Sequence, residues 1–157
     1  MAEELTAWSP AGFHLRPLQA TDYAKGYPQL LAALTQVGEL PEATFQSTLQ
    51  RLNSQPDTYL ILVLEEAETG ALAATGTLLV EQKFVHSAGK VGHVEDIVVS
   101  PDFERRGLGK KLIEVLERIA RGRGCYKVIL DCSEDVVGFY EKCGLVRKGA
   151  FMAQYFS

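Results

Sequence analysis

The sequence predicts a mixed α/β fold, in which a central, partly parallel sheet is flanked by helices. The chain of 157 residues is long enough for one domain with a real core. Its second half alternates strand, helix, strand, helix, strand, a spacing that requires a crossover between parallel strands. Within that half, an apolar run at 94–99 leads through a short loop into a glycine pair that opens a long amphipathic helix. We therefore expect a single domain over residues 12–157, preceded by a loose, flexible segment at 1–11.

The first half of the chain is expected to supply a strand, two helices and a β-hairpin. Thr21 and Asp22 are typical helix caps. Pro41 suits a first helical turn, and Phe45 and Leu49 recur behind it at helical spacing. A turn at 68–70 joins two β-rich runs into a hairpin. The expected elements are a strand at 13–17, a helix from 21 towards 36, a helix at 41–53, and strands at 58–65 and 71–82.

The second half is expected to hold the functional elements. Residues 97–99 alternate poorly, as in a strand that is buried on both faces. The next helix carries a single apolar face, and glycines at 122 and 124 end it. The expected elements are a loop at 86–90, a strand at 92–99, a helix at 108–121, a strand at 126–131, a short helix at 135–142 and a final strand at 149–155.

Composition excludes several classes of protein. The net charge of -4, with no basic arm or stripe, argues against a nucleic-acid partner. The acidic amino terminus differs from a secretory signal, and no apolar stretch is long enough to span a bilayer. Three cysteines without a C-x-x-C spacing indicate reduced thiols in the cytoplasm, and scattered histidines predict no metal site.

The glycine pair predicts an anion site. Backbone N–H groups at a helix N-terminus have no partner within the helix and suit a phosphate. Arg105, Arg106, Lys110 and Lys111 crowd this point of an otherwise acidic chain. A pyrophosphate is the ligand that fits best, and the alternative is a plain helix start with solvated charges.

At this point the sequence resembles the GNAT acetyltransferase superfamily and, more closely, its glucosamine 6-phosphate N-acetyltransferase family. The resemblance runs from about 13 to 156 and is carried by GHVEDIVV at 92–99, GCYKVILDC at 124–132 and GFYEKCG at 138–144, with LTQVG at 34–38 and EQKFVH at 81–86. It implies transfer of an acetyl group from acetyl-CoA to the 2-amine of glucosamine 6-phosphate, directly within a ternary complex and on the path to a nucleotide-activated sugar. It also implies a cytoplasmic homodimer, free or peripheral to the cytosolic face of an endomembrane, with the carboxy-terminal strand exchanged or packed across the interface.

The resemblance implies three contacts with acetyl-CoA. A bulge in the strand before the loop would free the main-chain N–H of Ile97 to face the thioester oxygen. Glu104 departs from the superfamily, which usually has Gln or Arg there. The backbone of Arg105, Arg106, Gly107, Leu108, Gly109 and Lys110 would hold the pyrophosphate; Ile97, Val98, Val99, Ser100, Pro101 and Asp102 would line the pantetheine arm; Tyr140, Glu141 and Lys142 would complete the site.

Two residues are the main catalytic candidates besides Ile97. Asp131 ends an apolar strand, where a carboxylate is poorly explained as solvated surface. It would either accept the proton of the amine or only orient it, and the alternative role is a strand-end cap. The Tyr140 hydroxyl would donate to the leaving sulfur, and the alternative is a core tyrosine. Glu95 and Asp96 would bind sugar hydroxyls or the amine. Cys132 is not expected to act as a nucleophile, since no histidine is placed by sequence to activate it.

The sugar phosphate needs hydrogen-bond donors. The matched segments suggest Thr35, Lys83, Phe84, Val85, His86, Tyr126 and Lys127 around the acceptor. Arginine, which animal and fungal members carry near the carboxy terminus, is missing from 152–155; Tyr155 offers a weaker, neutral hydrogen bond. Two other functions stay open: an N-acetyltransferase for another small amine or a protein, and a non-catalytic acetyl-CoA sensor.

Overall fold

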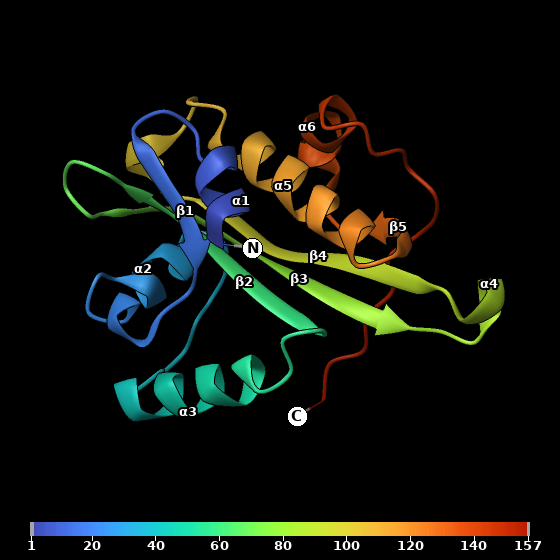
Figure 1. Ribbon diagram of the computed structural model, residues 1–157, viewed down its shortest axis with the longest axis horizontal. Helices are drawn as coiled ribbons and strands as arrows, with labels where there is room; N and C mark the ends of the chain where they lie inside the picture. Colours follow the sequence, from blue (N-terminus) through green and yellow to red (C-terminus); the bar gives the residue numbers. More distant parts are fainter. Residues whose placement is uncertain (1, 157) are drawn as a thin grey trace.

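The protein, a computed structural model that describes residues 2–156, is built on a five-stranded mixed sheet (Figure 1). The strands lie in chain order across the sheet, and only the last pair, β4 and β5, is parallel. The predicted partly parallel sheet is therefore confirmed. The strands are β1 (Phe13–Pro17), β2 (Tyr59–Glu66), β3 (Leu72–Gln82), β4 (Lys90–Val99) and β5 (Cys125–Ile129).

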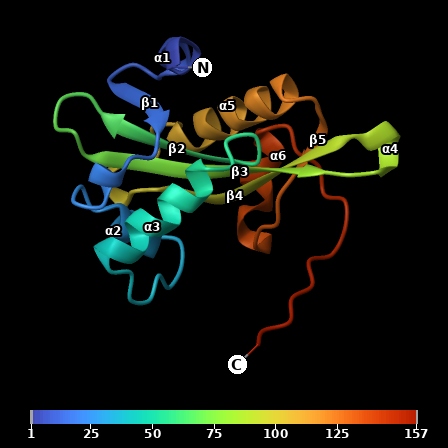
Figure 2. The same ribbon diagram turned by 60° about the horizontal axis from the view of Figure 1, so that its bottom comes forward.

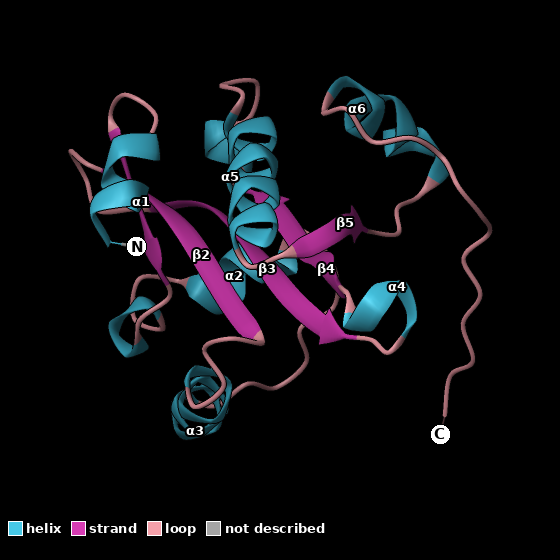
Figure 3. Ribbon diagram, turned by 45° about the vertical axis from the view of Figure 1, so that its right-hand side comes forward, coloured by secondary structure: helices cyan, strands magenta, loops and turns pink. Residues whose placement is uncertain are grey.

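Helices cover both faces of the sheet. Figure 2 shows α1 (Ala2–Trp8) and α5 (Leu108–Gly122) on one side, and α2 (Tyr27–Ala32) and α3 (Glu42–Asn53) on the other. Each side buries its own apolar cluster, because a sheet in the middle of a three-layer domain presents an apolar surface to both helical layers. The short helix α6 (Val137–Lys142) follows β5 at the end of the sheet (Figure 3).

The amino-terminal segment, where a loose stretch is predicted at 1–11, contains a helix. Residues 2–8 form α1, whose Leu5 is 1% exposed in the core cluster. The guanidinium of Arg118 on α5 lies 5.0 Å above the ring of Trp8. The burial of Leu5 and the contact of Trp8 with Arg118 hold a terminus that would otherwise fray. Met1 lies outside the described residues.

The predicted helix from 21 towards 36 is wrong in its extent. The chain forms a 3₁₀ turn at Ala20–Asp22 and then α2, with Gly26 between them at φ +87°. Asp22 caps only the turn: its fully buried carboxylate accepts the Gln19 N–H at 2.8 Å and two bonds from the Arg16 guanidinium at 2.8 and 2.7 Å. The break before α2 therefore lies at Gly26, and the ion pair of Asp22 with Arg16 on β1 is a tertiary contact that the local sequence does not reveal.

The carboxy-terminal segment does not form the strand that was predicted at 149–155. Residues 149–156 are extended, unpaired with any strand that the structure describes, and run away from the body of the protein (Figure 2). Tyr155 is 93% exposed. An apolar-rich extended segment becomes a strand only when a sheet edge pairs with it, and no edge of this chain does so.

Candidate active site

The strand β4 carries a bulge at the point where it was expected. Val98 pairs with Thr75 and Glu95 pairs with Thr77, so Asp96 and Ile97 together face the single residue Gly76. Asp96 adopts φ +52° at this bulge. The pairing between β4 and β5 ends at His93 and Ile129, so the two parallel strands are no longer paired beyond this point. The unpaired stretch opens the sheet next to Ile97.

The loop before α5 forms an uncapped helix N-terminus. Arg105 and Gly107 both adopt left-handed backbone, at φ +62° and +74°, which turns successive N–H groups towards one side. No side chain caps α5 at Gly107, and the first bond within the helix runs from the Lys111 N–H to the Gly107 carbonyl at 3.0 Å. The N–H groups of the first turn therefore have no partner within the helix and can bind an anion.

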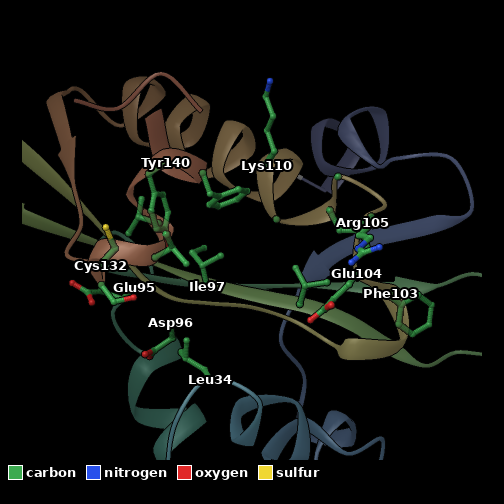
Figure 4. Close-up of a pocket in the computed structure, with 18 of the residues that line it drawn as sticks. Leu34, Glu95, Asp96, Ile97, Phe103, Glu104, Arg105, Lys110, Cys132 and Tyr140 are labelled. Atoms are coloured by element: carbon green, nitrogen blue, oxygen red, sulfur yellow. The ribbon is translucent and has the colours of Figure 1, made fainter. Parts of the chain in front are cut away.

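The basic side chains of the loop differ in their contacts. The Arg106 guanidinium lies 5.0 Å above the ring of Phe103 and 3.6 Å from the Glu66 carboxylate, so it ties the loop to β2. Lys110 is among the residues that line the cavity, and its side chain extends away from β4 (Figure 4). Because the Arg106 side chain is engaged with Phe103 and Glu66, only the backbone of Arg106 is available to bind a ligand.

A cavity of about 700 Å³ joins this loop to the carboxylates at the splayed end of the sheet (Figure 4). Its floor is the bulged part of β4, including Ile97 and Val99, and its walls are the α5 N-terminus and α6. The predicted site residues that it brings together are Glu95, Asp96, Ile97, Val99, Arg105, Gly107, Leu108, Gly109, Lys110, Asp131 and Tyr140.

A second cavity, of about 980 Å³, opens between β5, α6 and the segment at 144–151. Four residues line both cavities: Glu95, Asp131, Cys132 and Tyr140. The carboxylates and the tyrosine therefore lie where the two spaces meet. Of the predicted residues around the sugar, Lys127 lines the second cavity, as does Glu141 from the predicted coenzyme set.

Burial and neighbouring acids change the protonation of two of these groups. Burial, together with the charges of Asp131 and Asp96, raises the pKa of the Glu95 carboxyl above its usual 4.5. Burial, with smaller effects of Cys132, Cys143 and Asp131, raises the pKa of the Tyr140 phenol above its usual 10. Glu95 is thereby a better proton acceptor than a free carboxylate, and Tyr140 stays protonated as a donor.

The other predicted residues line neither cavity. Val98 is buried in the cluster on the α2 and α3 side, so its side chain faces away. Lys83 binds Glu81 at 2.7 Å, and the rings of His86 and Tyr126 lie 4.3 Å apart at the tip of the hairpin, where His86 adopts φ +54° within α4 (Val85–Ala88). The remaining predicted residues away from both cavities are Thr35, Phe84, Val85, Ser100, Pro101, Asp102, Arg106, Lys142 and Tyr155.

Sequence reasoning missed several cavity residues. Phe139, the neighbour of Tyr140 on α6, lines the first cavity together with it, and the two ring centroids lie 5.0 Å apart. Glycine at 109 makes this possible, because a Cβ there would lie 3.3 Å from the Phe139 ring. Leu34, Phe103, Ser133 and Val136 carried no local signal, since only the tertiary fold brings them to the site.

The described chain holds neither a cluster of metal ligands nor a membrane-spanning helix. No group of three His, Cys, Asp or Glu side chains within 2–156 is placed to hold a metal ion. None of the helices in that range combines the length and the apolar character needed to cross a bilayer.

Comparison with known proteins shows the family of the chain. The model of the acetyltransferase (GNAT) family matches residues 22–145. Glucosamine 6-phosphate N-acetyltransferase 1 of Oryza sativa subsp. japonica is 44% identical over 92% of this chain and 87% of its own length. The corresponding protein of Arabidopsis thaliana is 42% identical over 92% of this chain and 97% of its own. The crystal structure of the Arabidopsis thaliana protein superimposes with a TM-score of 0.89, covering 92% of this chain and 99% of that one. The chain therefore belongs to the GNAT acetyltransferases and, within them, to the glucosamine 6-phosphate N-acetyltransferase family.

Proposed function

We propose that the protein transfers the acetyl group of acetyl-CoA to the 2-amine of glucosamine 6-phosphate, giving N-acetylglucosamine 6-phosphate and CoA. One observation supports this most: Glu95, Asp131 and Tyr140 line both cavities. A donor that fills the first cavity and an acceptor that fills the second would meet at these three groups. Direct transfer needs such a junction, because both substrates must be held at once in reacting geometry.

The first cavity suits acetyl-CoA. The left-handed Arg105 and Gly107 and the uncapped first turn of α5 offer a row of N–H donors for the pyrophosphate. From there the pantetheine arm would follow Ile97 and Val99 along the cavity floor towards Tyr140. The coenzyme supplies an acyl carbon that is activated as a thioester.

Each residue at the junction has one task. Asp131 and Glu95 orient the amine, and one of them accepts the proton that the nitrogen loses as it bonds to the acyl carbon. The main-chain N–H of Ile97, at the bulge, donates to the thioester oxygen as negative charge develops there. Tyr140 donates to the sulfur, which keeps the electron pair of the broken C–S bond. The raised pKa values of Glu95 and Tyr140 suit an acceptor and a donor, respectively.

The second cavity suits the sugar phosphate. Basic side chains line it at His93, Lys127, Arg147 and Lys148. Two of them are already engaged: His93 lies 2.8 Å from a Glu81 carboxylate oxygen, and Arg147 binds the Glu134 carboxylate at 2.8 and 2.5 Å. Lys127 is the predicted phosphate donor that the fold brings to this cavity.

The protein is inferred to act as a homodimer. Apolar side chains are exposed to solvent on the hairpin tip, on β5 and on the carboxy-terminal segment. Such an exposed apolar surface favours association with a second copy of the chain. β5 pairs only with β4, so its outer edge is open to a strand from a second copy. The exposed apolar residues there are Phe84, Val85, Tyr126, Ile129, Phe151, Met152, Tyr155 and Phe156.

The reaction is tested by following free thiol while the purified protein is mixed with acetyl-CoA and one amine at a time. We expect CoA release with glucosamine 6-phosphate and at least about 10²-fold less with glucosamine, since the phosphate supplies binding energy that the second cavity can use. Equal rates with both sugars would contradict a phosphate site. Release with another amine alone would indicate a different acceptor, and acetyl-CoA binding without release would indicate a sensor.

The dimer is tested by sedimentation velocity. We expect the mass of a dimer, twice 17.3 kDa, for the full chain and the mass of a monomer for the chain that lacks 149–157, because the deleted segment would pair with the partner. Titration with acetyl-CoA controls for folding of the shortened chain, whose first cavity contains no residue from the deleted segment. A monomeric full chain would contradict the dimer.

A further inference from the structure

Gly76 lies on β3 directly opposite the bulge of β4. The register places Thr75 against Val98 and Thr77 against Glu95, so Gly76 faces both Asp96 and Ile97. Along an unbulged strand, side chains of alternate residues share a face. Here Val94 and Ile97, three residues apart, both pack in the cluster beneath α5. The bulge thus redirects the Ile97 side chain into the core at the level of Gly76.

Space, and not backbone conformation, requires glycine at this position. Gly76 is absent from the residues of positive φ, so any residue could adopt its backbone. A Cβ on Gly76 would lie only 2.4 Å from Cδ1 of Ile97, and 3.0 and 3.2 Å from side-chain carbons of Leu112 and Leu116. Glycine weakens a strand interior and often marks a close approach. The Ile97 side chain makes this approach.

If position 76 gains a side chain, Ile97 is the neighbouring residue that must move. Leu112 and Leu116 on α5 are fully buried, so they cannot swing away. β3 is fixed on its other side, because the buried Thr75 hydroxyl donates to the Leu62 carbonyl of β2 at 2.8 Å. Ile97 instead borders the open cavity, above the strand in Figure 4. Cδ1 of Ile97 fills the space between Gly76 and the two leucines, so a Cβ at position 76 would take that space from the Ile97 side chain.

We propose that Gly76 is a positioning residue for catalysis: the gap that it leaves anchors the Ile97 side chain and thereby aims the Ile97 main-chain N–H at the thioester oxygen. This inference rests on the proposed function of Ile97. It assigns a role in the reaction to a residue that lines neither cavity and offers no functional group to a substrate.

The experiment replaces Gly76 with Ala and measures both rate and polarisation of the thioester. We expect kcat to fall about tenfold, with the Kd for acetyl-CoA changed less than about threefold, because the loss falls on an interaction that strengthens in the transition state. The infrared carbonyl stretch of bound, ¹³C-labelled acetyl-CoA is expected to move back towards its frequency in solution. Gly92→Ala is the matched control, since a Cβ there meets three side-chain carbons at 3.1 Å, away from the bulge; it should leave the carbonyl stretch of the parent protein unchanged.

A double variant makes the test specific. Ile97→Val removes Cδ1, the atom that a Cβ at 76 would strike. We expect Gly76→Ala/Ile97→Val to match Ile97→Val alone in kcat and in carbonyl stretch. The proposal is overturned if the double variant stays as slow as Gly76→Ala, or if Gly76→Ala loses activity with an unchanged stretch.

A second variant tests the proposal if Gly76→Ala does not fold, and a measurement without the acceptor separates the role of Gly76 from the identity of the acceptor. If Gly76→Ala does not fold, Ile97→Ala empties the gap from the other side, and a carbonyl stretch as in the parent protein would then overturn the proposal. The stretch is measured with acetyl-CoA alone. A protein that polarises the thioester but does not acetylate glucosamine 6-phosphate would therefore refute the proposed acceptor and leave the role of Gly76 testable.

Discussion

Replacing Tyr140 with Phe is expected to lower kcat by about 10²–10³-fold while leaving the Kd for acetyl-CoA nearly unchanged. Tyr140 lines both cavities, and its phenol is the group that we propose as hydrogen-bond donor to the leaving sulfur. The hydrogen bond to sulfur strengthens only as the C–S bond breaks, so its loss falls on the transition state. Stopped-flow measurement of thiol release in a single turnover, with acetyl-CoA titrated separately, separates the two effects.

The same residue makes a prediction about pH. Because the pKa of Tyr140 is raised above its usual 10 by burial, its phenol keeps its proton at neutral pH and up to about pH 10. We therefore expect that loss of the Tyr140 proton causes no fall of kcat below pH 10. The alkaline limb of the kcat profile below pH 10 should have the same shape in the parent protein and in Tyr140→Phe. Tyr59→Phe, on β2 away from both cavities, is the matched control and should retain the parent kcat. A Tyr140→Phe variant with equal losses in kcat and in affinity would contradict the role of donor.

Replacing Asp131 with Asn is expected to lower kcat by about 10²-fold or more, if its carboxylate accepts the proton of the amine. Asn keeps the size and one acceptor oxygen but cannot take up a proton. A variant with a near-normal rate would leave Asp131 only orienting the amine, and Glu95 would then be the acceptor. Asp57→Asn, in the exposed turn before β2, is the matched control.

The pH profile distinguishes the two carboxylates. Glu95 accepts a proton only when ionised, so its activity is lost as pH falls through its raised pKa. The Asp131 charge contributes to that raised pKa, and Asn at 131 removes it. If Glu95 controls the acid limb of kcat/KM, the limb moves to lower pH in Asp131→Asn and vanishes in Glu95→Gln. If Asp131 controls it, Asp131→Asn removes the limb and Glu95→Gln leaves it in place.

Elements with strong periodic patterns were predicted closely. The strand Phe13–Pro17 and the helices α3 and α5 agree with expectation to within a residue or so at each end, because each depends on apolar spacing that is local in sequence. The start of α5 directly after Gly107 was likewise predicted correctly, since glycine before a helix is a local signal. The failures are α1, the interrupted helix around Gly26 and the unpaired segment at 149–156, where tertiary contacts or their absence decide the outcome.

The amino-acid sequence is enough to predict the mixed α/β fold, the uncapped start of α5 and the presence of Asp131 and Tyr140 next to apolar elements. Each follows from spacing within a few residues. Two features are visible in the folded chain alone: Glu95, Asp131 and Tyr140 lie at the junction of two cavities, and Gly76 leaves room for Ile97 beneath the bulge. These facts join residues from separate strands and helices, and such contacts depend on the packing of the sheet against α5 and α6, which no local pattern encodes.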